Sequence, residues 1–186
     1  MTETKFRFDR GMVRTVVTLL AFAAVVAFLL GLVNAITEDR IADYKAEKTL
    51  AAMKAVLPAN EYSELVYTGD PAVASVFRAG DKGWVIEVTP SGFGGLIDML
   101  VGVDTAGKVT GVSIISMSET SGLGANAARG SFRSQYVGKS GSVKLKKQGG
   151  EIDALTGATV TSTAVTKGVD TALSLAAELL KGGTLS

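Results

Sequence analysis

The stretch LIDMLVGVDTAGKVTGVSII, residues 96–115, decides the fold. Two apolar runs, residues 96–103 and 109–115, flank a short polar segment that contains Asp104, Gly107 and Lys108. β-Branched runs on either side of a glycine-containing turn favour an antiparallel hairpin. A hairpin of this length predicts a β-sheet at the centre of the folded domain.

Shorter runs of the same kind come before the hairpin, at residues 64–67, 72–79 and 84–89, with turn signals between them. After the hairpin come a glycine-bearing loop, a further segment at 132–137, a basic strand at 142–146 and a helix at 159–180. Strands followed by a helix predict an α+β domain, an antiparallel sheet closed by a C-terminal helix.

A second apolar run, residues 16–36, contains no charged side chain. As a helix it would be ~30 Å long, which is the thickness of the hydrocarbon core of a bilayer. A core helix would carry a polar stripe, whereas only Thr18 and Asn34 interrupt this run. A cleaved signal peptide is the alternative, but its apolar part is shorter, so we expect a retained transmembrane helix.

Charges on the two sides of this run predict its orientation. Basic residues precede it, and residues 38–57, which lack glycine and proline and stop at Pro58, predict a stalk helix. By the positive-inside rule the N-terminus is cytoplasmic. We therefore expect a cytoplasmic N-terminus and span at 1–36, a stalk at 37–58 and an extracytoplasmic domain at 59–186. The basic residues are Lys5, Arg7, Arg10 and Arg14.

Composition excludes several classes of chemistry. The 186 residues include no cysteine and no histidine, so disulfides, thiolate nucleophiles, Cys-ligated clusters, His-ligated metals and His-based triads are excluded. With 19 Lys and Arg against 18 Asp and Glu, a nucleic-acid partner is not expected. Redox or hydrolytic chemistry must come from a cofactor or from hydroxyls, carboxylates and amines.

The segment DALTGATVTS, residues 153–162, directly precedes the C-terminal helix. A hydroxyl-rich, glycine-containing turn at a helix start offers free backbone N–H groups and the positive end of a dipole, which suit a phosphate. The alternative is ordinary capping, in which Thr156 or Thr159 caps the helix. The residues alone favour the cap, since hydroxyls are common at helix starts and no acid or base accompanies this one in the sequence.

The string Asp153-x-x-Thr156-Gly157-Ala158-Thr159 resembles the flavinylation motif of a known FMN-binding domain. The G subunit of Rnf-type ferredoxin:NAD oxidoreductases and the C subunit of sodium-pumping NADH:quinone oxidoreductases share that domain. In that family the last Thr of the motif is joined to FMN through a phosphoester, which implies attachment at Thr159.

Two further loops carry the same resemblance. Glu119-Thr120-Ser121-Gly122-Leu123-Gly124 is similar to the family's Glu-Thr-Pro-Gly-Leu-Gly loop, and departs from it at Ser121. The turn Gly92-Phe93-Gly94-Gly95 is similar to its glycine-aromatic-glycine-glycine turn. The short chain resembles the G subunit more than the longer C subunit.

The resemblance implies roles for these residues, none of them catalytic and none a metal ligand. Around the phosphate we expect Thr156, Gly157, Ala158, Val160 and Thr161, and near the ring Gly92, Gly122, Leu123 and Gly124, with Glu119 or Thr120 at its polar edge. Phe93 either stacks on the flavin or fills the core, and a single aromatic more often fills the core. Asp153 either serves recognition by a flavin transferase or simply forms a turn.

The function implied is a membrane-anchored electron-transfer subunit of an ion-translocating complex, with no substrate turnover of its own. Its implied partners are other membrane and redox subunits, a flavin transferase that uses FAD and magnesium, and the lipid of the cell (inner) membrane. The alternatives are a C-type subunit or a membrane-tethered module that senses a free anionic ligand or flavin without electron transfer.

Overall fold

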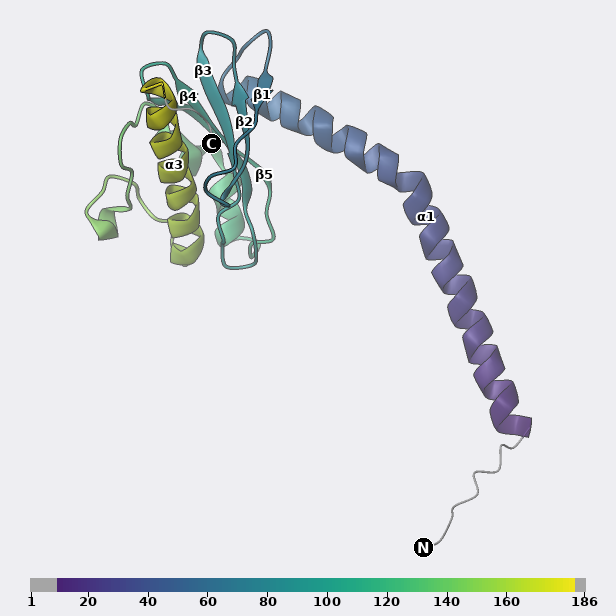
Figure 1. The fold of residues 1–186 in the computed structure, drawn as a ribbon. Helices are drawn as coiled ribbons and strands as arrows, with labels where there is room; N and C mark the ends of the chain where they lie inside the picture. The colour runs from purple at the N-terminus through teal and green to yellow at the C-terminus, as the bar shows by residue number, and fades with distance from the viewer. Residues whose placement is uncertain (1–9, 183–186) are drawn as a thin grey trace, which may run out of the picture. The chain divides into compact units, whose positions relative to one another are not determined.

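The computed structural model describes residues 10–182, and within them a five-stranded antiparallel sheet confirms the predicted α+β class (Figure 1). The strands lie in the sheet in the order in which they occur along the chain. They are β1 Ser63–Leu65, β2 Val73–Arg78, β3 Gly83–Val88, β4 Asp98–Asp104 and β5 Val109–Ser116.

Strands β4 and β5 form the predicted hairpin, with Val101 opposite Val112. The turn is closed by the Asp104 carboxylate, whose Oδ1 accepts hydrogen bonds from the amides of Ala106 and Lys108, both at 2.9 Å. Gly107 lies in the left-handed region at φ +74°, which only glycine adopts without cost. Local turn chemistry therefore fixes the register of the central strands.

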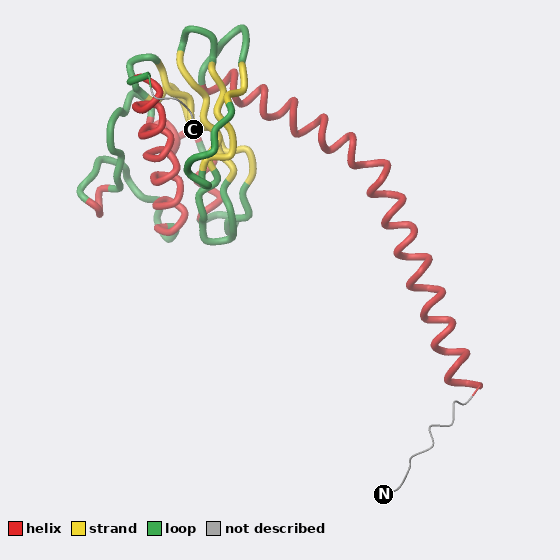
Figure 2. Tube along the Cα trace, in the orientation of Figure 1, coloured by secondary structure: helices red, strands yellow, loops and turns green. Residues whose placement is uncertain are grey.

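The helix α3, Thr159–Leu180, covers one face of the sheet, as Figure 2 shows. Its buried side chains recur at helical spacing, for example Val165, Val169, Ala172 and Ala176, and pack against buried residues of β3 and β4. Gly168 allows the close approach, since a Cβ there would lie 3.0 Å from Pro90 Cγ. The predicted closing helix is confirmed.

The end of helix α1, Arg10–Val56, covers the opposite face with Met53 and Val56. Gly102 and Gly111 stand opposite each other in β4 and β5, and a Cβ on either would lie within 2.9 Å of a Val56 backbone atom. Thr110 Oγ1 donates to the Val56 carbonyl at 2.6 Å. The two glycines thus allow the end of α1 to pack directly on the backbone of β4 and β5.

The apolar part of α1 has the properties of a membrane span. Among the described residues one helix, over Arg10–Glu38, is long and apolar enough to cross a membrane, with mean hydropathy 2.9 in its most apolar window and none of that window buried. Phe22 and Phe28 are 71% and 70% exposed, unlike residues of a soluble core helix. The residues predicted as a stalk continue the same helix, while Lys5 and Arg7 lie outside the described residues.

The predicted basic strand at 142–146 is wrong. That segment makes one isolated bridge, Leu145 to Ile152, and the Val143 amide donates to Asp170 Oδ1 at 2.8 Å. Left-handed glycines at both ends of the segment turn the chain away from the sheet.

The segment 132–137 consists of short helical turns, α2 Gly130–Arg133 and η2 Ser134–Tyr136. They place Phe132 and Tyr136 in the core, edge to face, with ring centroids 5.6 Å apart. Two further short turns, η1 Gly124–Ala128 and η3 Lys146–Gln148, complete the described elements.

Candidate functional site

Three segments that are far apart in the sequence meet at one pocket of about 380 Å³. They are the turn after β3, the loop after β5 and the first turn of α3. Most of the predicted site residues line this pocket: Phe93, Glu119, Thr120, Leu123, Gly124, Gly157, Ala158, Thr159, Val160 and Thr161.

The Glu119 carboxylate joins all three segments. Its Oε1 accepts hydrogen bonds from the amides of Phe93 at 2.8 Å and Gly94 at 3.0 Å. Its Oε2 accepts from the hydroxyl of Thr161, which is 1% exposed, at 2.6 Å. Both oxygens are therefore used by donors of the protein itself, across 25 to 42 residues of sequence.

Glycines leave the space that this carboxylate occupies. A Cβ at Gly92 would lie 2.2 Å from Glu119 Oε1, and one at Gly124 would lie 2.5 Å from Oε2 and 2.7 Å from Thr161 Oγ1. Partial burial alone would raise the pKa of Glu119, but the hydrogen bonds from Thr161, Gly94 and Phe93 outweigh it, and the pKa is lowered. Glu119 is thus held ionised in a fixed position.

The start of α3 lacks a side-chain cap. Ala158 is the capping residue and makes no side-chain hydrogen bond, so the expectation that Thr156 or Thr159 caps the helix is wrong. Thr159 is the first residue of α3, it is exposed, and its hydroxyl has no hydrogen-bond partner among residues 10–182. Over the same described range, the amides of residues 159–161 have no acceptor.

The turn before α3 is held from inside by Ser162, for which the sequence suggested no role. Its Oγ accepts from the Leu155 amide at 2.9 Å and donates to the Ala158 carbonyl at 2.9 Å. Gly157 lies at φ +74°, where a side chain would be strained. This bracing holds the turn that leads into the first turn of α3, whose residues 159–161 line the pocket.

The rim of the pocket is apolar and open. Phe93 is 73% exposed, Leu123 45% and Val160 54%, so the expectation that Phe93 fills the core is wrong. Apart from Glu119, the segments that line the pocket, residues 90–97, 120–128 and 154–166, contain no charged residue. An apolar rim beside unpartnered amides and a hydroxyl fits a flat apolar ring that carries a phosphate.

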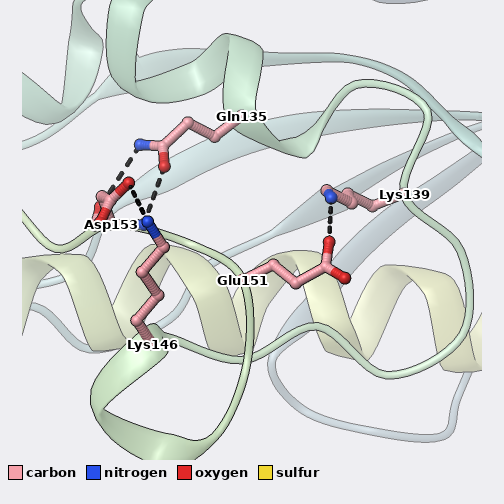
Figure 3. A network of polar contacts seen from close by, with 5 residues as sticks. All are labelled: Gln135, Lys139, Lys146, Glu151 and Asp153. Carbon is pink, nitrogen blue, oxygen red and sulfur yellow. Dashed lines mark hydrogen bonds and ion pairs between the residues drawn. The ribbon is translucent and has the colours of Figure 1, made fainter.

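Four predicted residues do not line the pocket. Gly92 lies behind it against Glu119, the Gly122 carbonyl accepts from Asn126 Nδ2 at 2.7 Å, and Thr156 is exposed on the turn. The fourth, Asp153, belongs to a separate polar network (Figure 3).

In that network Lys146 Nζ lies 2.8 Å from Asp153 Oδ2, and the Gln135 side chain bonds both the amide and the carbonyl of Asp153. Lys139 pairs with Glu151 nearby, and this ion pair lowers the pKa of Glu151. Gln135 and Lys146 were not predicted as site residues, because they lie 18 and 7 residues before Asp153, outside the motif that carries the resemblance.

Comparisons with known proteins agree with this geometry. A family model described as an FMN-binding domain matches residues 92–174, and one described as the RnfG N-terminal region matches residues 1–56. Residues 92–174 include all three segments that meet at the pocket.

Several relatives are subunits of oxidoreductase complexes. The G subunit of the Na⁺-translocating ferredoxin:NAD⁺ oxidoreductase complex of Acetobacterium woodii is 32% identical over 97% of this chain and 99% of its own. The G subunit of the ion-translocating oxidoreductase complex of Methanosarcina acetivorans is 33% identical over 89% and 94%. The proton-translocating counterpart from Clostridium ljungdahlii is 48% identical over 48% of this chain, and the match spans about half, 51%, of its length.

Proposed function

The chain belongs to the family of G subunits of ion-translocating ferredoxin:NAD oxidoreductase complexes, and from this premise we propose that it carries electrons on an FMN attached covalently at Thr159. The observation that carries the proposal is the exposed, unpartnered Thr159 hydroxyl at the mouth of a pocket within the matched FMN-binding domain. A phosphoester there needs a free hydroxyl, and no group among residues 10–182 bonds to this one.

The turn that leads into α3 suits the phosphate of that ester. The amides of residues 159–161 and the positive end of the helix dipole stabilise an anion at this point. Phe93, Leu123 and Val160 offer apolar surface for a ring beside it. FMN itself supplies the electron-transfer chemistry, and the protein supplies position and electrostatics.

Attachment requires a second protein in this proposal. The chain has no histidine, and Glu119, the carboxylate that lines the pocket, is occupied by three donors, so the described residues of the pocket offer no free base to activate the Thr159 hydroxyl. A flavin transferase would supply that base and FAD. The Thr159 oxygen then bonds to the phosphorus of the FMN half, the anhydride bond of FAD breaks, AMP leaves, and the hydroxyl proton passes to the transferase.

The span at residues 16–36 anchors the domain to the membrane in this proposal. It contains no ionisable side chain, so ions cross through other subunits of the complex. The basic residues before the span favour a cytoplasmic N-terminus and an extracytoplasmic FMN domain. A covalent bond keeps the cofactor with a domain that has no access to fresh cytoplasmic flavin.

The test is flavin fluorescence of the denatured chain in a gel, after expression with and without the transferase. The wild-type chain is expected to fluoresce only when it is expressed with the transferase. Thr159→Ala is expected to fold but to show no flavin fluorescence in either case. Thr159→Ser keeps a hydroxyl and is expected to retain some signal. Thr156→Ala and Thr161→Ala are the matched controls and are expected to keep at least part of it. A dark wild type in the presence of transferase would favour a module that binds a free ligand.

A further inference from the structure

We propose that Glu119 is a positioning residue whose fixed negative charge lowers the reduction potential of the flavin. The inference rests on the proposed function, because it needs a flavin in the pocket. In this role Glu119 does not bind the flavin directly, since both carboxylate oxygens accept hydrogen bonds from the protein's own donors.

The charge of Glu119 is not neutralised. All three of its donors are neutral, two backbone amides and one hydroxyl. Among residues 10–182, Lys139 pairs with Glu151 and Lys146 with Asp153, and no lysine or arginine pairs with Glu119. The pocket segments contribute no lysine or arginine. One net negative charge therefore remains on the pocket lining.

The charge is also fixed in place. The glycines at 92 and 124 enclose the carboxylate so closely that a Cβ on either would collide with it. The three hydrogen bonds hold the ionised form and lower the pKa of Glu119. A side chain held in this way does not turn away when the charge near it changes.

Reduction adds electrons to the flavin, and a fixed like charge in the same pocket opposes this. Water at the open rim weakens the effect but does not reverse its sign. The site therefore favours the oxidised flavin and releases electrons readily. Glu119 thus has two effects. It joins the three segments of the pocket, and it lowers the reduction potential of the flavin.

Glu119→Gln separates the two effects. The Gln carbonyl oxygen can accept both amide hydrogen bonds and its NH₂ can donate to Thr161, so the geometry is kept and the charge is lost. Thr161→Val makes the opposite change, because it removes the hydroxyl and keeps the charge. Glu178→Gln is the matched control, since Glu178 is exposed and ~28 Å along α3 from Thr159.

The measurement is a redox titration of the full-length chain in detergent, with mass spectrometry to establish that each variant carries flavin. Glu119→Gln is expected to shift the reduction equilibrium about tenfold or more toward reduced flavin, which is about 30 mV for a two-electron couple. Glu178→Gln is expected to match wild type, and Thr161→Val, which keeps the charge, is expected to shift the equilibrium less than Glu119→Gln does.

Three results would overturn the inference. The first is an unchanged potential in flavin-loaded Glu119→Gln, and the second is an equal shift in Thr161→Val. The third is a Glu119→Gln chain that takes up no flavin while Thr161→Val does, because the charge would then serve attachment. A wild-type chain without flavin would instead refute the proposed function and this inference with it.

Discussion

Three hydroxyls in the first turn of α3 have three different environments. Thr159 lines the pocket and its hydroxyl has no partner in the described part of the chain, Thr161 donates to Glu119, and Ser162 is buried and braces the preceding turn. A modifying enzyme that needs an accessible and unbonded hydroxyl would find it at Thr159. Among these three hydroxyls, hydrogen bonding therefore supports the proposed attachment at Thr159.

Tyr136 gives a prediction for alkaline pH. The Thr166 hydroxyl donates to the Ser162 carbonyl at 2.7 Å, so the buried Tyr136 hydroxyl donates to Thr166 at 2.8 Å. Burial raises the pKa of Tyr136 to about 12. Because the folded pKa lies above the unfolded one, this stability is complete below pH ~10 and is lost as the pH rises through about 12.

Tyr136→Phe is expected to lower the free energy of unfolding by about 1 kcal/mol at neutral pH through the lost hydrogen bond. It should also remove a pH-dependent loss of about 3 kcal/mol between neutral pH and pH ~12. Urea unfolding at several pH values measures both effects. Tyr44→Phe, at an exposed position on α1, is the control. An alkaline loss that is the same in Tyr136→Phe as in wild type would contradict the assignment.

The loop that follows β5 and the first turn of α3 meet at Gly124, which is buried. A Cβ there would press on both Glu119 and Thr161, so Gly124→Ala is expected to break their hydrogen bond and cost about 1–3 kcal/mol. We also expect the yield of flavin attachment to fall, because the pocket wall shifts. Thermal unfolding and in-gel fluorescence measure the two effects.

Gly130→Ala is the matched control for this prediction, because a Cβ at Gly130 meets no atom within 4 Å. It is expected to be close to wild type in both assays. If the two substitutions have the same effect, the close contacts at Gly124 do not contribute to stability or to flavin attachment, and the prediction is wrong.

Sequence patterns predicted correctly those elements whose determinants all lie within the element itself. The hairpin 96–115 carries its own turn chemistry, and the helix 159–180 its own apolar spacing, and both were correct. The basic strand at 142–146 was wrong because its partner is a side chain, Asp170, rather than another strand. Strand pairing depends on neighbours that a local pattern does not contain.

The pocket was partly predictable for the same reason. Resemblance to a family supplied the three glycine-containing segments, and the structure brings them together around Glu119. That the Glu119 carboxylate accepts hydrogen bonds from the protein itself could not be inferred, since its donors lie 25 to 42 residues away in sequence.

The protein as a whole combines an apolar helix with a charge-poor pocket. The sidedness of the domain is a prediction from the basic residues before the span. Protease added to spheroplasts is expected to digest the domain and leave a short N-terminal fragment. In inside-out vesicles the domain should survive, and its survival in intact spheroplasts would reverse the orientation.

The most direct measurement is the position of the flavin on the chain. Trypsin releases residues 148–167 as one peptide, which includes Thr156, Thr159, Thr161 and Ser162. Tandem mass spectrometry of the chain made with the transferase is expected to find this peptide heavier by FMN minus one water, with fragment ions that place the addition on Thr159. An unmodified peptide, or an addition on another residue, would contradict attachment at Thr159.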